Sequence, residues 1–312
     1  MSDTAPTIAP PHPDPRVPGF VLPPLACDSH CHIFGPGSRY PYAASRPYTP
    51  PDAPLAKLQA LHARLRIERA VLVNATPHGC DNRVVTDAIA ASGGRYKGIA
   101  NIDPSFDGGA IKALTAAGIV GCRFTFLARL GGRPDIDAFL TVVRRTAPYD
   151  WHVDLYLPAE HLETFAPTLD RLAIPYVLDH LGLIDAGRGL DQPGFRAVAE
   201  RYARDRKCWV KVTCPERISA SGAPYHDVGP FARRLIEIDP DRLLWGTDWP
   251  HPNVKAMPDD GDLVDLIPVY ADDPGIRQKL LVDNPARLFN FPICGDDDGA
   301  RAQSLSTFAT RP

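Results

Sequence analysis

Three histidines and one aspartate stand at the ends of short apolar segments, where side chains of these types could activate water. His30 and His32 lie two apart in DSHCH, His180 ends PYVLDH, and Asp248 ends RLLWGTD. Residues two apart on a strand point to the same side, so His30 and His32 could aim at one point. A hydrogen-bonded pair of core histidines would show the same spacing. The addition of His180 and Asp248 favours a site where imidazoles and a carboxylate act on a water molecule.

Three arginines accompany these groups. Arg123 and Arg129 lie in and just after the segment VGCRFTF, and Arg217 follows CWVKVT. An arginine offers a planar pair of N–H donors that matches a carboxylate. An ion pair with a local acid would explain any one of them singly. Three arginines at the same set of segment ends favour a pocket that binds an anion. Arg123 in particular lies in an apolar run, where an unpaired charge would be costly.

The segments that carry these residues alternate regularly with helical patterns. Short apolar runs rich in β-branched residues are typical of buried parallel strands, and they occur at 25–30, 70–75, 97–103, 120–126, 152–157, 175–180, 208–213 and 242–248. Helical patterns occur at 54–65, 81–92, 108–118, 135–146, 159–172, 194–205, 228–238 and 274–289.

This alternation predicts an α/β fold of the (β/α)8 TIM-barrel type. In such a barrel the C-terminal ends of the strands form the active-site face, which would bring the histidines, Asp248 and the arginines together. An open doubly wound sheet is the alternative. It is weakened because no GxGxxG sequence follows the first strand.

Composition bounds the class of protein. The chain has 312 residues, 44% of them hydrophobic, and a formal net charge of -3, which gives no sign of a nucleic-acid or membrane surface. The N-terminus lacks the pattern of a signal peptide, so we expect a cytoplasmic location. We expect a proline-rich arm over 1–23, a barrel over 24–292 and a polar tail over 293–312. The expected partner is a small anionic molecule, and the oligomeric state is left open.

Several motifs carry a family resemblance. DSHCH, LDHLG and WGTDWPHPN, in that order on an eightfold β/α pattern, resemble the amidohydrolase superfamily. The longer stretches DSHCHIFGP, HGCDN, GCRFTFLARL, WHVDLY, TCPERI and WGTDWPHPN resemble the 2-pyrone-4,6-dicarboxylate hydrolase family of lactonases. The similarity spans roughly residues 25 to 290.

This resemblance implies hydrolysis of the lactone ring of 2-pyrone-4,6-dicarboxylate, a step in the breakdown of lignin-derived aromatic compounds. It implies that Asp248 is the general base and that His30, His32 and His180 polarise the lactone carbonyl. It also places eight residues on the substrate: Arg123, Arg129, Arg217, Tyr48, Thr76, Tyr156, His251 and Asn253.

The metal content of such a site follows from its residue types. Most amidohydrolases bind one or two divalent ions, and the two-metal members bridge them with Lys or Glu on strand 4. The segment VGCRFTF has neither, which argues against two metals. His30, His32, His180 and Asp248 could hold a single ion such as zinc. The resembled lactonases work without a metal, and an enol lactone has a good leaving group, so we expect that no cofactor is required.

Three other functions fit parts of the pattern. Another anionic lactone, such as a sulfomuconolactone, would use the same arginines. A metal-dependent decarboxylase of the same superfamily would need a bound ion. A non-catalytic sugar- or acid-binding barrel would gain nothing from a buried general base, and Asp248 therefore argues against it.

Overall fold

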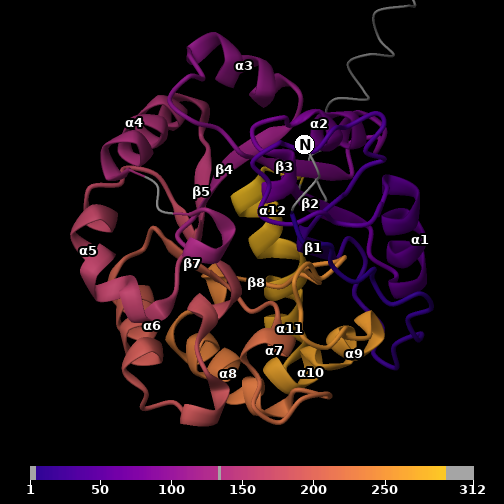
Figure 1. Ribbon diagram of the computed structural model, residues 1–312. Helices are drawn as coiled ribbons and strands as arrows, with labels where there is room; N and C mark the ends of the chain where they lie inside the picture. The colour runs from indigo at the N-terminus through magenta and orange to yellow at the C-terminus, as the bar shows by residue number, and fades with distance from the viewer. Residues whose placement is uncertain (1–4, 133–134, 293–312) are drawn as a thin grey trace, which may run out of the picture.

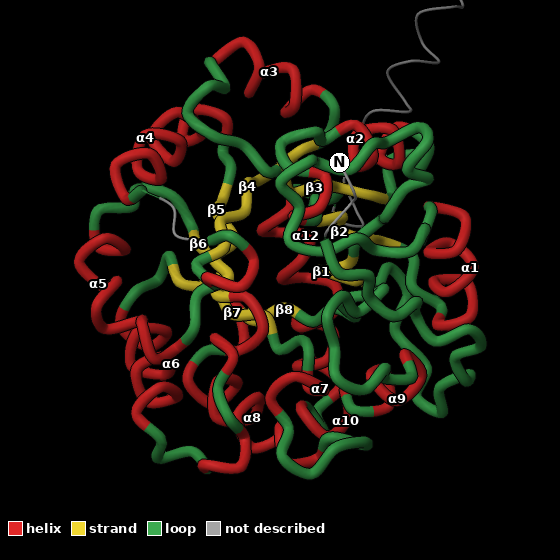
Figure 2. The backbone as a smooth tube through the Cα atoms, in the orientation of Figure 1, coloured by secondary structure: helices red, strands yellow, loops and turns green. Residues whose placement is uncertain are grey.

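Eight parallel strands form one sheet in which neighbours in sequence are neighbours in space, ordered β1 to β8 (Figures 1 and 2). The computed structural model describes residues 5–132 and 135–292. The strands are β1 (Cys27–Cys31), β2 (Arg69–Val73), β3 (Tyr96–Ala100), β4 (Ile119–Thr125), β5 (His152–Tyr156), β6 (Tyr176–Leu178), β7 (Cys208–Lys211) and β8 (Leu243–Leu244). The predicted (β/α)8 barrel is confirmed.

Backbone hydrogen bonds between β1 and the segment after β8 close the ring. The strand predicted over 242–248 is regular only at Leu243–Leu244, but the pairing continues beyond it. Ser29 N–H donates to Trp245 O at 2.9 Å, and Asp248 N–H donates to His30 O at 2.7 Å. His32 N–H donates to Trp249 O, also at 2.7 Å. We call residues 29–32 and 245–249 the closing seam. It places Asp248 directly beside the two histidines of β1.

Helices surround the ring of strands, as Figure 1 shows. They are α1 (Leu55–Leu65), α2 (Arg83–Ala90), α3 (Gly108–Ala116), α4 (Ile136–Thr146), α5 (Leu162–Asp170), α6 (Pro193–Arg204), α7 (Pro215–Ile218), α8 (Gly229–Ile238), α9 (Asp260–Asp265), α10 (Ile267–Tyr270), α11 (Pro274–Gln278) and α12 (Asn284–Phe289). The helix predicted over 274–289 is divided into α11, a π-helical turn at Lys279–Asp283 and α12.

Local sequence explains why these helices form and dock. In α4, the Asp135 side chain caps the N-terminus by accepting from Asp137 N–H, and Arg144 and Arg145 stand in the last turn, where cations are favoured. The apolar face of α4, which includes Phe139, is buried against the barrel. In α2, α6 and α8 the buried residues likewise include a set of apolar side chains, although no side chain caps their N-termini. Helices of this kind cover the strands, which explains the continuous apolar runs of the strands.

A separate apolar cluster contains side chains from seven strands together with Phe289 and Phe291 at the end of the chain's last helix. Val71 of β2, Val177 of β6 and Trp209 of β7 belong to it. This cluster forms the lower layer of side chains, and the polar groups occupy the layers above it.

The terminal segments differ in how far they are described. Residues 5–23 carry a single isolated bridge, from Thr7 to Thr49, and no helix. Arg16 in this arm binds Asp262 and Asp265 of α9 at 2.5 and 2.6 Å. The predicted tail at 293–312 lies outside the described residues. In the described ranges, no helix is both long and apolar enough to cross a membrane.

The Asp28 carboxylate accepts hydrogen bonds from both sides of the closing seam. Its Oδ1 accepts from the backbone N–H groups of His30 at 3.1 Å and Thr247 at 2.9 Å, and its Oδ2 accepts from the Thr247 hydroxyl at 2.6 Å. Asp28 is fully buried, so no solvent replaces these bonds if the carboxylate is removed.

We therefore expect Asp28→Ala to lower the free energy of unfolding by about 3 kcal/mol, because two buried N–H groups and one hydroxyl lose their acceptor. Chemical denaturation measures the change. Asp191→Ala removes an exposed carboxylate and is the control. Equal stability of the two variants would show that Asp28 does not hold the seam.

Candidate active site

Three imidazole nitrogens converge on one carboxylate oxygen at the C-terminal end of the barrel. Asp248 Oδ1 lies 3.2 Å from His32 Nε2, 3.5 Å from His30 Nε2 and 4.0 Å from His180 Nε2. All four residues are buried. The structure thus brings together the four residues that sequence reasoning proposed as the catalytic set.

Asp248 is held in its ionised form. Its Oδ2 accepts from Arg217 Nη2 at 2.8 Å. Burial alone would raise the pKa of Asp248, but Arg217 and the histidines His32 and His180 outweigh it and hold the pKa well below its usual range. The carboxylate can therefore accept a proton at neutral pH.

Each imidazole is oriented by a bond on its far side. His32 Nδ1 lies 2.8 Å from the carbonyl oxygen of Val73, so Nδ1 donates there. His180 Nδ1 lies 2.7 Å from the Thr213 hydroxyl. Burial lowers the pKa of His180 well below its usual range, so this ring is neutral.

The backbone around the site adopts left-handed conformations that residues other than glycine rarely occupy. His180 has a φ of 54°, Cys214 of 55°, Asp248 of 65°, His251 of 58° and Asn253 of 64°. Each such residue costs about 1–3 kcal/mol unless its surroundings impose it. These strained residues lie where the backbone changes direction after a strand. The turn directs their side chains toward the barrel axis.

A buried charged layer lies beneath the histidines. His152, Asp154 and Tyr156 alternate on one side of β5, which puts Asp154 below Tyr156. Lys211 Nζ donates to Asp154 Oδ2 at 2.5 Å and to His30 Nδ1 at 3.0 Å, and it lies 3.2 Å from Asp179 Oδ1. Lys211 is completely buried, and these three groups are its partners.

The three predicted arginines occupy different electrostatic positions. Arg123 Nε donates to Asp179 Oδ2 at 2.9 Å, and Arg217 binds Asp248. Arg129 has no carboxylate partner among the described residues, and its Nη2 donates to the Tyr156 hydroxyl at 3.5 Å. Arg129 is therefore the arginine whose charge the protein leaves unbalanced.

A cavity opens above this layer, with about 340 Å³ of empty space that includes open solvent. Ten of the twelve predicted site residues line it, and these are His32, Tyr48, Thr76, Arg123, Arg129, Tyr156, His180, Arg217, Asp248 and Asn253. His30 lies just below. His251 is fully buried and does not line this cavity. Its Nε2 is 3.0 Å from Asp260 Oδ1, and its contact with substrate stays a prediction.

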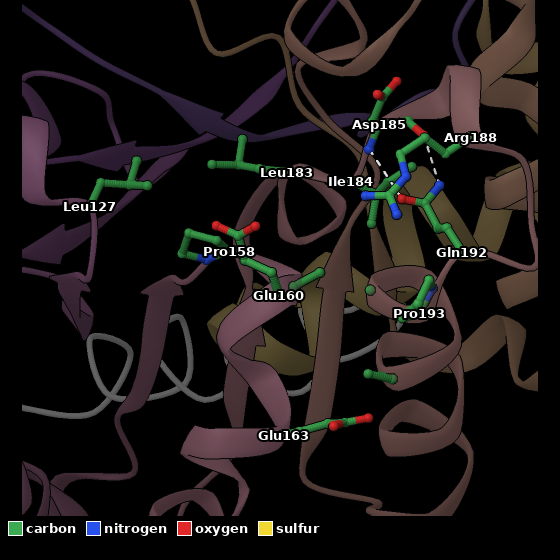
Figure 3. Close-up of a pocket in the computed structure, with 13 residues that line it drawn as sticks. Leu127, Pro158, Glu160, Glu163, Leu183, Ile184, Asp185, Arg188, Gln192 and Pro193 are labelled. Atoms are coloured by element: carbon green, nitrogen blue, oxygen red, sulfur yellow. Dashed lines mark hydrogen bonds between the residues drawn. The ribbon is translucent and has the colours of Figure 1, made fainter.

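A second pocket, with about 1190 Å³ of space that includes open solvent, is lined by residues such as Asp185, Arg188 and Gln192 (Figure 3). Its polar groups bind one another: Gln192 Nε2 donates to Asp185 O at 2.7 Å, and Asp185 N–H donates back to Gln192 Oε1 at 3.4 Å. No histidine lines it, and its one arginine is Arg188. Size alone does not make it the reactive site.

The donor set was tested against a single divalent ion. The ligand atoms of His30, His180 and Asp248 lie within 4.8 Å of one another and are of types that zinc accepts. His30 fits poorly, because its Nδ1 faces the Lys211 ammonium group, which can only donate a hydrogen bond. An imidazole that accepts at Nδ1 carries its proton on Nε2 and has no lone pair for a metal there.

Sequence reasoning missed the groups below the histidines. Asp154, Asp179 and Lys211 each stand inside an apolar strand segment, HVDLYL, PYVLDH or CWVKVT. A single charged residue inside an apolar run indicates a buried ionic group, and this signal was applied to Arg123 only. Applied to every strand, the same signal would have found all three.

Comparison with known proteins agrees with this geometry. The family described as Amidohydrolase matches residues 27–291. A 2-pyrone-4,6-dicarboxylate hydrolase of Comamonas testosteroni is 44% identical over 88% of this chain and 93% of its own length. A 4-sulfomuconolactone hydrolase of Hydrogenophaga intermedia is 41% identical over 86% of this chain and 90% of its own.

Solved structures show the same architecture. The crystal structure of a putative 2-pyrone-4,6-dicarboxylic acid hydrolase from Pseudomonas putida superposes with a TM-score of 0.75 at 29% identity, covering 87% of this chain and 100% of that one. From the matched range, the identities and the shared barrel, the chain belongs to the amidohydrolase family and groups with its lactone hydrolases, as its motifs predicted.

Proposed function

We propose that this protein hydrolyses the lactone ring of 2-pyrone-4,6-dicarboxylate. The observation that carries the proposal is the convergence of three histidines on the ionised Asp248, next to three arginines in one small cavity. The similarity to the Comamonas hydrolase supports the choice of substrate. The product is the open-chain tricarboxylate, in its enol or keto form.

The reaction begins with water held by Asp248. Asp248 takes a proton as the water oxygen attacks the lactone carbonyl carbon. The ring C–O bond then breaks, and Asp248 returns the proton to the departing enol oxygen. His30 and His180 stabilise the oxyanion that forms in between, because donors fixed in advance in a dry site act more strongly than water does.

The arginines bind the two carboxylates and also tune the base. A substrate carboxylate that engages Arg217 competes with Asp248 for the same guanidinium. This weakens the interaction that keeps the pKa of Asp248 low and makes Asp248 a better base once substrate is present. Arg129 adds positive charge that no carboxylate of residues 5–132 and 135–292 pairs with, which favours a dianionic ligand.

A second candidate substrate is a sulfomuconolactone. The 41% identity with the Hydrogenophaga hydrolase favours it over other lactones. A sulfonate would replace one carboxylate on the same arginines. Comparison of kcat/KM for the two lactones separates these candidates.

We further propose that the reaction needs no metal. The support is chemical: the lactone is activated by its enol leaving group, the arginines supply positive potential, and the protein directs a lysine at His30. A metal-dependent decarboxylase would instead need His30 to present an unprotonated nitrogen to the metal ion.

Purified protein should therefore consume 2-pyrone-4,6-dicarboxylate, followed as loss of the pyrone absorbance, at the same rate with and without a chelator. Absence of turnover would remove the proposed function. Loss of activity with chelator, restored by added zinc, would overturn the metal-free version alone.

Asp248→Asn should lower kcat by at least about 1,000-fold, because the base is lost. Binding of the lactone should be unchanged or tighter, because a negative charge leaves a site that takes a dianion. Kinetics and calorimetric titration measure the two effects. Asp185→Asn, in the second pocket, should keep wild-type rates. Near-normal turnover of a folded Asp248→Asn would contradict the scheme.

Arg129→Met should raise KM by about 10- to 100-fold with a smaller effect on kcat, because a charge-assisted bond to a carboxylate is lost. Arg188→Met removes an arginine from the second pocket and serves as its control. If both variants have the same KM, Arg129 does not bind the substrate.

A further inference from the structure

The role of Lys211 goes beyond balancing buried charge. A lysine ammonium has three N–H donors and no acceptor. Lys211 Nζ faces three acceptors: Asp154 Oδ2 at 2.5 Å, His30 Nδ1 at 3.0 Å and Asp179 Oδ1 at 3.2 Å. Asp154 and His30 accept hydrogen bonds from Lys211, whereas Asp179 forms an ion pair with it. One of the three partners is therefore an imidazole nitrogen.

The ammonium form is the one that this surrounding stabilises. Burial alone would lower the pKa of Lys211, but the two carboxylates outweigh it and raise the pKa above its ordinary value. An ammonium N–H can donate only to an unprotonated nitrogen, so the 3.0 Å contact with Lys211 Nζ requires a neutral His30 ring with a bare Nδ1. A neutral ring carries one proton, and a charged lysine at Nδ1 leaves it on Nε2.

The alternative position for that proton is disfavoured by geometry. Asp179 Oδ1 lies 3.4 Å from His30 Nδ1 and could accept from a protonated Nδ1. That proton would then face an ammonium group 3.0 Å away. Asp179 also accepts from Arg123 at 2.9 Å and lies 3.2 Å from Lys211, so two cations balance its charge without a proton on His30 Nδ1.

The other nitrogen of the ring has no protein partner. His30 Nε2 is buried and forms no hydrogen bond with the described residues, which is rare for a buried polar atom. It lies 3.5 Å from Asp248 Oδ1, at the place where a water or a carbonyl oxygen would meet the base.

We propose that Lys211 is a positioning residue that fixes His30 with its proton on Nε2, which makes His30 a hydrogen-bond donor to the lactone carbonyl and removes it from any metal-ligand set. The effect of this tautomer on catalysis rests on the proposed lactone hydrolysis. The position of the proton on His30 does not depend on that proposal. His32, whose Nδ1 donates to Val73 O, is oriented in the opposite sense. Adjacent histidines of one motif thus have different roles.

The tautomer can be read directly by 15N NMR of histidine side chains, with the His30 signals assigned by their loss in His30→Gln. In the wild-type protein, without substrate, Nε2 should show the shift of a protonated nitrogen and Nδ1 that of a bare one. A protonated Nδ1, or a bare Nε2, in the wild type would overturn the proposal.

Two variants then test whether Lys211 is the cause. Asp154→Asn keeps the lysine and should keep the tautomer. The double variant Asp154→Asn, Lys211→Met removes a buried charge pair together, which avoids leaving one charge unpaired. In the double variant the proton should move to Nδ1 and bond Asp179. Lys207→Met, outside the site, is the control for loss of a lysine. An unchanged tautomer in the folded double variant would contradict the role of Lys211.

Two further readouts accompany the NMR. Relative to Asp154→Asn, the double variant should lose about 100-fold in kcat with little change in KM, because an oxyanion donor is removed. It should also bind Zn²⁺ more tightly in calorimetric titration, since His30 regains a lone pair at Nε2. A double variant with the kinetics and zinc affinity of Asp154→Asn would contradict the proposal. Failure of the wild-type enzyme to hydrolyse the lactone would remove the proposed function and leave the tautomer result standing.

Discussion

The closing seam between β1 and the segment after β8 is the constraint on which the site depends. Two backbone hydrogen bonds of 2.7 Å join Asp248 N–H to His30 O and His32 N–H to Trp249 O. These backbone bonds alone hold Asp248 beside His30 and His32, without any contribution from side chains. Because the seam lies at the C-terminal ends of the strands, it is also part of the active-site face. One set of backbone bonds therefore both closes the barrel and assembles the catalytic group.

Charge balance explains why so many ionisable groups are tolerated at this depth. Arg123, Lys211 and Arg217 are matched by Asp154, Asp179 and Asp248 through contacts of 2.5 to 3.2 Å. A buried charge without a partner would cost several kcal/mol. The layer is neutral as a whole, so its internal pairs add little net field at the cavity. Arg129 lies outside this balance, and its charge remains for the ligand.

The sequence alone predicted the barrel, the order of its elements and the convergence of His30, His32, His180 and Asp248. These follow from strand periodicity and from the rule that strand ends share one face. Other features depend on contacts distant in sequence. The short β8 and its continuation through the seam could not be predicted, because WGTDWPHPN pairs with β1, which lies near the other end of the sequence. The place of His251 is set by Asp260. The lysine behind His30 comes from a strand 181 residues away, and only the folded chain brings the two together.

The central claim is that a dianionic lactone, and not a metal ion, completes this cluster of histidines and Asp248. A crystal structure of Asp248→Asn with bound 2-pyrone-4,6-dicarboxylate tests it most directly. The account predicts the lactone carbonyl oxygen within hydrogen-bond distance of His30 Nε2 and a substrate carboxylate on Arg129. Anomalous scattering from a metal ion between His30, His32 and His180, in crystals of the wild-type protein, or a lactone bound away from His30, would contradict it.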